Sequence, residues 1–338
     1  MSALEQRATT YRGLVTTEMR AAIGEEPDGL FAWMRYHLGW EDAEGNRVNS
    51  SPGKMIRPVG LLLATELCGG DPERSAPAAA AIELVHNFSL LHDDVEDRSD
   101  RRRGRPTLWT FTSEAQAINT GDGMFTLART TMLNLEDRGV SPERTLRAVR
   151  ELDEACIQLV HGQYLDISFE ERDDVTLDEY STMASGKTAA MFAAPLAIGA
   201  IVAGASEATV EAFRTAGRHI GLGFQMVDDV LGIWGDPAVT GKPVGDDIRS
   251  RKMTYPVISA LGNDHSGLKS LYATPSSGDQ EIEQISLLIE QGGGRHATEQ
   301  RAQEERDRAL AIVEGAGIVG EALEQLHAYA SVAIGRAS

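Results

Sequence analysis

Apolar residues recur at three- and four-residue spacing along most of the chain, which is the period of an α-helix that buries one face. The spacing is clearest in residues 58–67, 76–91, 145–165, 210–233 and 299–313. No run of four to eight residues has the β-branched alternation that is typical of a strand. The pattern therefore predicts a protein that is helical almost throughout.

Glycine and proline interrupt this pattern in only a few places. The breaks lie at residues 69–72, at the arginine-rich stretch that ends with Pro106, and at residues 235–245, 262–278 and 292–294. None is long or polar enough for a linker between domains, and no segment repeats with a period of 20–50 residues. We therefore expect one all-α domain over residues 1–338.

The composition is that of a globular protein with an acidic surface. The chain has 338 residues, of which 42% are hydrophobic, so it can bury a large core. Its 32 Lys and Arg residues against 51 Asp and Glu residues give a net charge of −19. Because affinity for nucleic acid needs a basic surface, this charge argues against nucleic acid as a partner. Two cysteines, Cys68 and Cys156, are too few for a disulfide framework.

Two features concern targeting and membranes. Residues 1–7 lack the apolar core of a signal peptide, so we expect a cytoplasmic protein. Residues 189–205 are almost all apolar, but a membrane span needs about 20 such residues. This run is rich in Ala and Gly, contains Pro195 and lies in the middle of the chain. We interpret it as a pair of buried helices rather than a membrane span.

The first acidic cluster follows a predicted apolar helix. Five acids occupy residues 93–100, and four arginines follow within residues 101–105. At helical spacing Asp93 and Asp97 share one face, with Asp94 beside them. Carboxylates about 6 Å apart repel by roughly 3 kcal/mol at an effective dielectric constant of about 20. The cluster therefore indicates either a hard divalent cation with oxygen ligands or a solvated helix end paired with the arginines.

A second Asp pair, Asp228 and Asp229, ends another apolar helix and precedes a glycine-rich loop that carries Lys242 and Lys252. Paired carboxylates on two helices predict a magnesium site, because magnesium binds one or two carboxylates together with phosphate oxygens of a substrate. Lysines cannot ligate the metal, so they indicate an anionic substrate, and a diphosphate fits both requirements. Further basic groups, those of residues 53–58 among them, indicate more than one anion.

In these features the sequence resembles the isoprenyl (polyprenyl) diphosphate synthases. The resemblance extends from about Tyr36 to the last predicted helix, with several motifs in the family's order. The matching motifs are Gly53-Lys54-x-x-Arg57-Pro58, Asp93-Asp94-x-x-Asp97 with Arg102-Arg103-Gly104, Gly162-Gln163-x-x-Asp166, Lys187-Thr188 and Phe224-Gln225-x-x-Asp228-Asp229. The resemblance implies an all-α, isoprenoid-synthase-type helical bundle around a central cavity, and a homodimer.

The resemblance also implies a reaction and its residues. Isopentenyl diphosphate would be condensed with an allylic diphosphate (dimethylallyl, geranyl or farnesyl) after magnesium-assisted ionisation. Three magnesium ions are implied, two at Asp93, Asp94 and Asp97 and one at Asp228 and Asp229. The allylic diphosphate would be held by Arg102, Lys187, Lys242 and Lys252, and isopentenyl diphosphate by Lys54, Arg57, His86 and Arg103. The backbone of Lys187 and Thr188, together with Gln225, would face the developing allylic cation.

The chain departs from the family pattern at two positions. Gly232 stands where the second acidic motif usually ends in a third Asp, and Asp236, one turn further, is the nearest acid on that face. Because the family assigns the third metal mainly to the first Asp of this motif, we expect activity to survive. Met55 replaces an arginine of the lysine motif, which affects the tightness of isopentenyl diphosphate binding more than the reaction.

Product length depends in this family on the residue five positions before the first acidic motif, which here is Phe88, followed by the small Ser89. Five residues along a helix span about 7.5 Å, which leaves room for some isoprene units above an aromatic floor. This pattern resembles that of geranylgeranyl diphosphate synthases, so we expect geranylgeranyl diphosphate as the main product. The alternatives are a farnesyl or longer product, with Phe88 as an ordinary core residue.

Other classes of protein share some of these features. A class I terpene cyclase uses the same metal-triggered ionisation, but it usually carries an Asn/Asp, Ser/Thr and Glu triad that we do not find. A non-catalytic partner subunit is compatible with Gly232. A di-iron centre needs two Glu-x-x-His pairs, and the chain has Glu83/His86 and Glu324/His327. The remaining histidines, His37 among them, are interpreted as structural or exposed.

Overall fold

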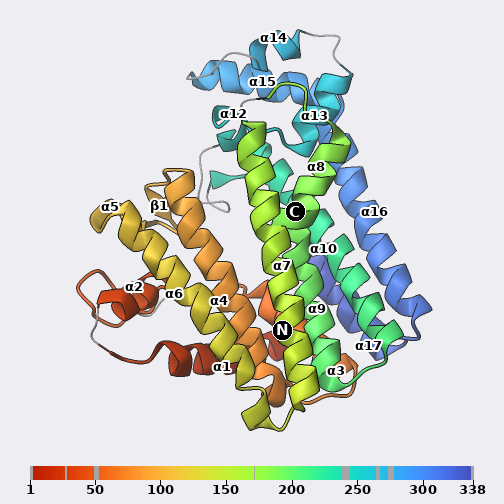
Figure 1. Cartoon of the computed structure of the whole chain (residues 1–338). Helices are drawn as coiled ribbons and strands as arrows, with labels where there is room; N and C mark the ends of the chain where they lie inside the picture. Colours follow the sequence, from red (N-terminus) through yellow and green to blue (C-terminus); the bar gives the residue numbers. More distant parts are fainter. Residues whose placement is uncertain are drawn as a thin grey trace. The chain divides into compact units, whose positions relative to one another are not determined.

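Nearly every element of the protein is a helix in the computed structural model (Figure 1). The structure describes residues 3–26, 29–48, 53–170, 172–237, 244–263, 267–272 and 278–335. The prediction of an all-α protein is therefore confirmed.

Contacts within the chain divide it into two compact units. Unit 1 comprises Met1–Glu154 and Ala194–Phe213, and unit 2 comprises Ala155–Ala193 and Arg214–Ser338. The unit boundaries fall inside three helices, α7 (Pro142–Phe169), α9 (Ala190–Ala203) and α10 (Glu207–Trp234). A single domain over residues 1–338 stays a prediction.

In unit 1, α4 (Pro72–Glu96) packs against α1 (Ala3–Ile23), α3 (Ile56–Leu67) and α6 (Glu114–Leu133), and Figure 1 shows α4 and α6 side by side. The smaller elements are α2 (Gly29–His37), α5 (Leu108–Phe111) and the 3₁₀ helix η1 (Glu136–Arg138). The sequence defines where α4 begins, because the Asp71 carboxylate accepts a hydrogen bond from the Glu73 N–H at 2.9 Å and a proline follows Asp71.

Strands are confined, within the described ranges, to one short hairpin after α4. β1 (Arg101–Arg102) pairs antiparallel with β2 (Arg105–Pro106), with Arg101 opposite Pro106 and Arg102 opposite Arg105. The hydrophobic pattern did not predict this hairpin, because a strand of two residues is too short to show alternation.

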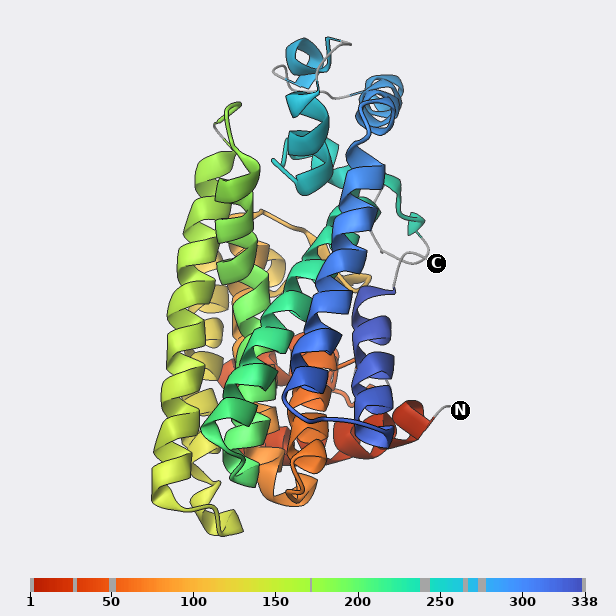
Figure 2. The same cartoon turned by 90° about the vertical axis from the view of Figure 1, so that its right-hand side faces the viewer.

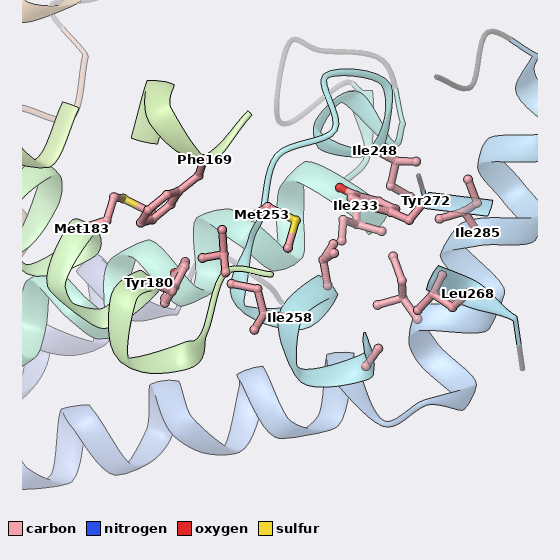
Figure 3. Packing of buried hydrophobic residues seen from close by; sticks show 14 of the residues in the cluster. Phe169, Tyr180, Met183, Ile233, Ile248, Met253, Ile258, Leu268, Tyr272 and Ile285 are labelled. Carbon is pink, nitrogen blue, oxygen red and sulfur yellow. The ribbon is translucent and has the colours of Figure 1, made fainter. Parts of the chain in front are cut away.

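The helices of unit 2 pack around an apolar core. They are α8 (Leu177–Ala184), the π-helix η2 (Ser185–Ala189), α12 (Asp246–Arg249), α13 (Tyr255–Gly262), α14 (Leu268–Tyr272), α15 (Asp279–Gln291), α16 (Gly294–Gly315) and α17 (Glu321–Ile334). The long helix α16 packs against α13, α15 and α17 (Figure 2). Phe169, Tyr180 and Met183 join buried residues of α12 to α15 in one cluster, part of which Figure 3 shows.

Most of the apolar stretch of residues 189–205 lies within a continuous helical run, Leu177–Ala203. By length and composition this run could cross a membrane, but 89% of its most apolar window is buried inside the protein. Burial of this extent is what the core helix of a folded domain requires. The run therefore agrees with the interpretation of residues 189–205 as buried helices.

A glycine on α7 allows a close backbone approach within unit 2. A Cβ at Gly162 would lie only 2.0 Å from the backbone nitrogen of Lys187 in η2. On the other side, a Cβ at Gly186 would lie 2.6 Å from the carbonyl oxygen of Gln158. Both contacts are backbone to backbone, so no side-chain movement can relieve them. Two glycines that are far apart in the sequence therefore hold η2 against α7.

We expect Gly162→Ala to lower the free energy of unfolding by about 1–3 kcal/mol, because the added methyl group overfills this contact. Urea unfolding followed by circular dichroism measures the change. Gly13→Ala is the matched control, since Gly13 is also helical but a Cβ there meets nothing within 4 Å. The control should be neutral or stabilising by up to about 1 kcal/mol. Equal effects of the two substitutions would contradict the close approach.

Candidate functional site

The acidic end of α4 places its three aspartates in different surroundings. Asp94 is 1% exposed, and its Oδ1 accepts a hydrogen bond from Nε of Arg102 at 2.7 Å. Burial raises the pKa of Asp94, and the Arg102 guanidinium opposes this shift. Asp93 is half-buried and Asp97, the residue that caps the helix, is exposed. The protein thus holds Asp94 itself, whereas Asp93 and Asp97, one turn apart, remain accessible to solvent.

The turn of the hairpin consists of Arg103 and Gly104, whose φ angles are +51° and +76°. Two positive φ angles in a two-residue loop are those of a type I′ turn, which suits the twist of the strands. Glycine adopts this backbone freely, but the arginine is strained by about 1 kcal/mol or more. The turn sends neighbouring arginines to different partners. Arg102 bonds Asp94, and Nη2 of Arg103 lies 4.0 Å from where a Cβ of Gly53 would be.

The base of the hairpin is fixed to the segment that follows α2. Arg105 donates hydrogen bonds to the carbonyl oxygens of Tyr36 at 2.9 Å and of Glu41 at 2.6 Å. The Arg105 guanidinium also lies over the Tyr36 ring, 4.1 Å from its centroid. With its base held in this way, the hairpin gives Arg102 and Arg103 defined positions.

A second group of basic side chains gathers around the start of α3 and the middle of α4. Nη1 of Arg57 lies 3.4 Å from Nε2 of His86. Burial lowers the pKa of His86 well below its ordinary value, and the neighbouring arginines, Arg57 first, lower it further. The ring is therefore neutral at physiological pH and can form a hydrogen bond without adding charge. Lys54 is exposed on the loop before α3.

His37, which the sequence led us to interpret as structural or exposed, belongs to this basic group. Burial lowers its pKa to about 3, and Arg102 and Arg103 act in the same direction. His37 is the last residue of α2, and the hairpin anchored there by Arg105 brings the arginines to it. A lone histidine at the end of a helix carries no motif, so only the fold could identify it.

Glu83 is a buried acid that the proposed reaction roles did not include. It is 5% exposed, and Nδ2 of Asn87, one turn later, donates to its Oε1 at 3.1 Å. Oε2 of Glu83 has no hydrogen-bond partner among the residues that the structure describes. Burial raises the pKa of Glu83 to about 7, while Arg57 and the Asn87 hydrogen bond act against this rise. Glu83 therefore places a titratable carboxyl beside the basic group.

In unit 2, Lys187 lies in the π-helix η2 and pairs with Asp166 of α7. Nζ of Lys187 donates to Oδ2 of Asp166 at 2.5 Å. Single π-helical turns interrupt the regular hydrogen-bond ladder and occur frequently at functional sites. These contacts explain the spacing of the motif Gly162-Gln163-x-x-Asp166. Its glycine admits the Lys187 backbone, and its aspartate binds the Lys187 ammonium group.

Asp229 is the centre of a buried hydrogen-bond network. Its Oδ2 accepts from the Tyr180 hydroxyl at 2.6 Å and from the Tyr255 N–H at 2.9 Å. Its Oδ1 accepts from Nε2 of Gln225 at 2.8 Å, and Oε1 of Gln225 accepts from the Thr188 hydroxyl. Burial raises the pKa of Asp229 to about 7, although these hydrogen bonds favour the ionised form. The network orients Gln225, and metal binding by Asp229 stays a prediction.

Asp228 and Lys252 of unit 2 differ in burial. Asp228 is exposed on α10, so it is the accessible carboxylate of the second acidic pair. Lys252 is half-buried, and its carbonyl oxygen accepts a hydrogen bond from the Tyr272 hydroxyl at 2.7 Å. The Lys252 N–H donates to the carbonyl oxygen of Asp247 at 2.9 Å. Lys242 lies outside the described residues.

Backbone strain in the described ranges is concentrated beside the predicted site residues. The non-glycine residues with positive φ there are Met55, Arg98, Arg103 and Arg251. Each of them is a predicted site residue or the direct neighbour of one. A left-handed non-glycine residue costs about 1 kcal/mol or more, and it persists only where its surroundings impose it. The distribution of strain therefore supports a functional role for these segments.

Phe88, the predicted floor of the product pocket, is 7% exposed and lies between two other rings. Its centroid is 4.7 Å from that of Phe125 on α6 and 5.4 Å from that of His92, both edge-on. The imidazole fits because Gly121 has no Cβ, which would lie 2.4 Å from Nε2 of His92. Ser89 turns its hydroxyl back onto its own helix. The Phe88 ring is therefore held in one orientation by α4 and α6.

The donor set fits magnesium that is bound together with a substrate. Among the described residues, no three His, Cys, Asp or Glu side chains converge to enclose a metal ion, as a di-iron centre would require. Magnesium usually takes one or two carboxylates, keeps several waters and shares phosphate oxygens. Oδ2 of Asp94 is buried without a hydrogen-bond partner in this part of the chain, and Asp93 and Asp97 are accessible beside it. These carboxylates suit an ion that arrives with a diphosphate.

An all-α fold with aspartate pairs at the ends of two helices, each near basic side chains, defines a protein of the isoprenoid-synthase class. The sequence model of the Polyprenyl synthetase family matches residues 43–289, and the chain belongs to this family. It is therefore an enzyme of the trans-prenyltransferase type.

Individual relatives cover almost the whole chain. A (2E,6E)-farnesyl diphosphate synthase of Mycobacterium tuberculosis is 41% identical over 93% of this chain and 89% of the relative. A geranylgeranyl diphosphate synthase of the same species is 40% identical over 92% of this chain and 88% of the relative. The crystal structure of a polyprenyl synthetase from Streptomyces coelicolor has a TM-score of 0.91 and 37% identity, covering 98% of this chain and 99% of that one.

A second solved structure carries ligands. It is a geranylgeranyl pyrophosphate synthase from Corynebacterium glutamicum complexed with isoprenyl diphosphate and magnesium. Its TM-score is 0.85 and its identity 28%, over 99% of this chain and all (100%) of that one.

We expect Glu83→Gln to stabilise the protein increasingly as the pH rises. Below the ordinary pKa of 4.5 the carboxyl is protonated in both states, so the substitution changes little there. Between pH 4.5 and about 7 only the folded protein keeps the proton, so the stability of the unsubstituted protein falls relative to that of the variant. The difference in free energy of unfolding should reach on the order of 3 kcal/mol by pH 8.

Urea unfolding at pH 5, 6, 7 and 8 measures this difference. Glu73→Gln, at an exposed position of the same helix, is the control and should show no such trend. A difference that stays constant over the pH range would mean that Glu83 is ionised throughout.

Proposed function

We propose that the protein condenses isopentenyl diphosphate with an allylic diphosphate (dimethylallyl, geranyl or farnesyl) and that its main product is geranylgeranyl diphosphate. The carbon–oxygen bond of the allylic diphosphate breaks, a carbon–carbon bond to isopentenyl diphosphate forms, and a proton is lost. The products are a longer allylic diphosphate and inorganic pyrophosphate.

The observation that carries this proposal is that the two adjacent arginines of the hairpin, Arg102 and Arg103, have different partners. Arg102 pairs with Asp94 of the acidic motif. Arg103 instead extends toward Gly53, and its charge lowers the pKa of His86, which contacts Arg57. One type of anion site is therefore linked to carboxylates and suits a metal-bound diphosphate. The other contains cations and neutral imidazoles and suits a diphosphate without metal. Two different diphosphate sites are what a condensation of two diphosphates requires.

Magnesium, three ions by analogy with the family, would supply charge that stabilises the departing diphosphate. We assign its binding to Asp93, Asp94 and Asp97 in unit 1 and to Asp228 in unit 2. The basic side chains would hold the diphosphates of both substrates. The set comprises Lys54, Arg57, His86 and Arg103 for isopentenyl diphosphate, and Arg102, Lys187, Lys242 and Lys252 for the allylic substrate.

Thr188 and Gln225 would face the allylic cation with oriented dipoles. The Thr188 hydroxyl donates to Oε1 of Gln225, whose amide group donates in turn to Asp229. Since both ends of the Gln225 amide are bonded, its dipole is fixed before the substrate arrives, which is the condition for electrostatic stabilisation without reorganisation. Asp229 thus acts as the positioning group for Gln225.

The relatives do not determine the product length. A farnesyl and a geranylgeranyl diphosphate synthase are about equally similar to this chain, at 41% and 40% identity. The support comes from Phe88. Its ring is held against Phe125 and His92, so it cannot easily turn aside for a growing chain. A fixed aromatic floor with the small Ser89 next to it favours a twenty-carbon product.

We further propose a cytoplasmic, non-membrane-spanning homodimer. The support for the dimer is an apolar stripe on α7, where Ile157 is 71%, Val160 58% and Tyr164 66% exposed. Residues spaced in this way lie on one helix face, and exposed apolar faces mark interaction sites. A second copy of the chain would cover this face, and light scattering should then give twice the chain mass of 36.5 kDa.

A product assay tests the function. Purified protein is incubated with magnesium, isopentenyl diphosphate and, separately, each of the three allylic primers, and the dephosphorylated products are sized by mass spectrometry. We expect a linear alcohol of twenty carbons. A cyclic hydrocarbon would identify a terpene cyclase, and no condensation with any primer would favour a non-catalytic partner subunit.

Phe88→Ala should lengthen the product to twenty-five carbons or more, because removal of the ring opens the floor of the pocket. The same mass assay measures the product distribution. Phe111→Ala is the matched control, since this phenylalanine is exposed at 42% on α5, away from the Phe88 ring contacts. An unchanged twenty-carbon product from Phe88→Ala would show that Phe88 is a core residue and not the floor.

A further inference from the structure

Gly232, where the second acidic motif lacks its usual third aspartate, has an acidic side chain pressed against it. A Cβ added at Gly232 would lie 1.9 Å from Oδ2 and 2.4 Å from Cγ of Asp247. The Asp247 carboxylate therefore occupies the space that a side chain at position 232 would take. Any residue other than glycine at position 232 would therefore force the Asp247 side chain to move.

The position of Asp247 is determined by its neighbours on α12. Ile248 is 1% exposed in the apolar core of unit 2, where Figure 3 labels it. Arg249 pairs with Asp279 at the start of α15. On the other side, the carbonyl oxygen of Asp247 accepts the N–H of Lys252, whose own carbonyl oxygen accepts the Tyr272 hydroxyl. Core packing and hydrogen bonds thus hold the carboxylate over Gly232.

This placement brings the carboxylate to the acidic end of α10. Gly232 lies four residues after Asp228, so the two positions share one face of the helix. The Asp247 carboxylate therefore lies at the same end of α10 as Asp228, although it comes from a separate segment of the chain.

Magnesium keeps part of its water shell in proteins, so a carboxylate can hold the hydrated ion from more than one backbone position. A residue that reaches the same space from another segment can therefore serve the same purpose as the missing motif aspartate.

We propose that Asp247 replaces the absent third aspartate of the second acidic motif and, with Asp228, positions the hydrated magnesium ion that accompanies the allylic diphosphate. The proposal rests on the proposed function. Helical spacing gave Asp236 as the nearest acid on that face, whereas the three atoms nearest to a Cβ at Gly232 all belong to Asp247 from another segment.

A magnesium titration tests the proposal without relying on catalysis. The melting temperature is followed as magnesium is added at a fixed concentration of inorganic pyrophosphate, and isothermal titration calorimetry repeats the measurement. Asp247→Asn keeps the shape of the side chain but removes its charge. It should raise the magnesium concentration at half effect about tenfold, because groups that orient a metal shell contribute this much to affinity.

A swap variant distinguishes the carboxylate from the loop that carries it. Gly232→Asp combined with Asp247→Gly returns the acid to the helix and empties the space it needs, so it should restore the half-effect concentration to within about threefold of the original protein. Asp246→Asn, the neighbouring acid on α12, is the matched control and should leave the titration unchanged.

The outcomes separate the two proposals. If Asp247→Asn titrates like the original protein, the inference is wrong and the proposed function is untouched. If the folded swap variant stays as weak as Asp247→Asn, Asp247 acts through its own loop and does not replace a motif aspartate. If the original protein shows neither magnesium-dependent stabilisation by pyrophosphate nor condensation, the proposed function fails and this inference fails with it.

Discussion

The ion pair between Asp94 and Arg102 is the constraint on which the site in unit 1 depends. The Asp94 side chain is only 2% exposed, so its charge needs the Nε donor of Arg102 at 2.7 Å. Removing one partner of such a pair leaves a buried charge, which typically costs about 3–5 kcal/mol. Because Arg102 leads directly into the strained turn, the pair also determines where Arg103 lies. The acidic motif and the basic group are thus coupled through one hairpin.

Unit 1 gathers several arginines around neutral histidines. Arg57 stands next to a neutral His86, and Arg102 and Arg103 act on the neutral His37. Neutral imidazoles supply hydrogen bonds without increasing the repulsion among the arginines. The buried carboxyl of Glu83, whose pKa burial raises to about 7, interacts with Arg57 of this group. The proposed diphosphate would add negative charge to this group of arginines, which is how charge repulsion in the folded chain can favour binding.

Unit 2 gives different surroundings to two aspartates that are adjacent in the sequence. Asp229 is buried and accepts hydrogen bonds from two tyrosine residues and Gln225, whereas Asp228 is exposed. A side chain that accepts three hydrogen bonds orients other groups, and its accessible neighbour can meet a hydrated ion. Glycines make the arrangement possible, because Gly162 and Gly232 leave room for a backbone and for a carboxylate.

The sequence by itself determined the helical fold, the two acidic motifs and the basic segments, because helical periodicity and charged residues at fixed spacing are local properties. It could not separate Asp228 from Asp229 or include His37 and Glu83 in the site. Burial and hydrogen bonding decide those roles, and both depend on residues far away in the chain, such as Tyr180, Tyr255 and Arg105. Only the tertiary structure shows what occupies the space next to Gly232, because the Asp247 carboxylate that lies there comes from a different helix.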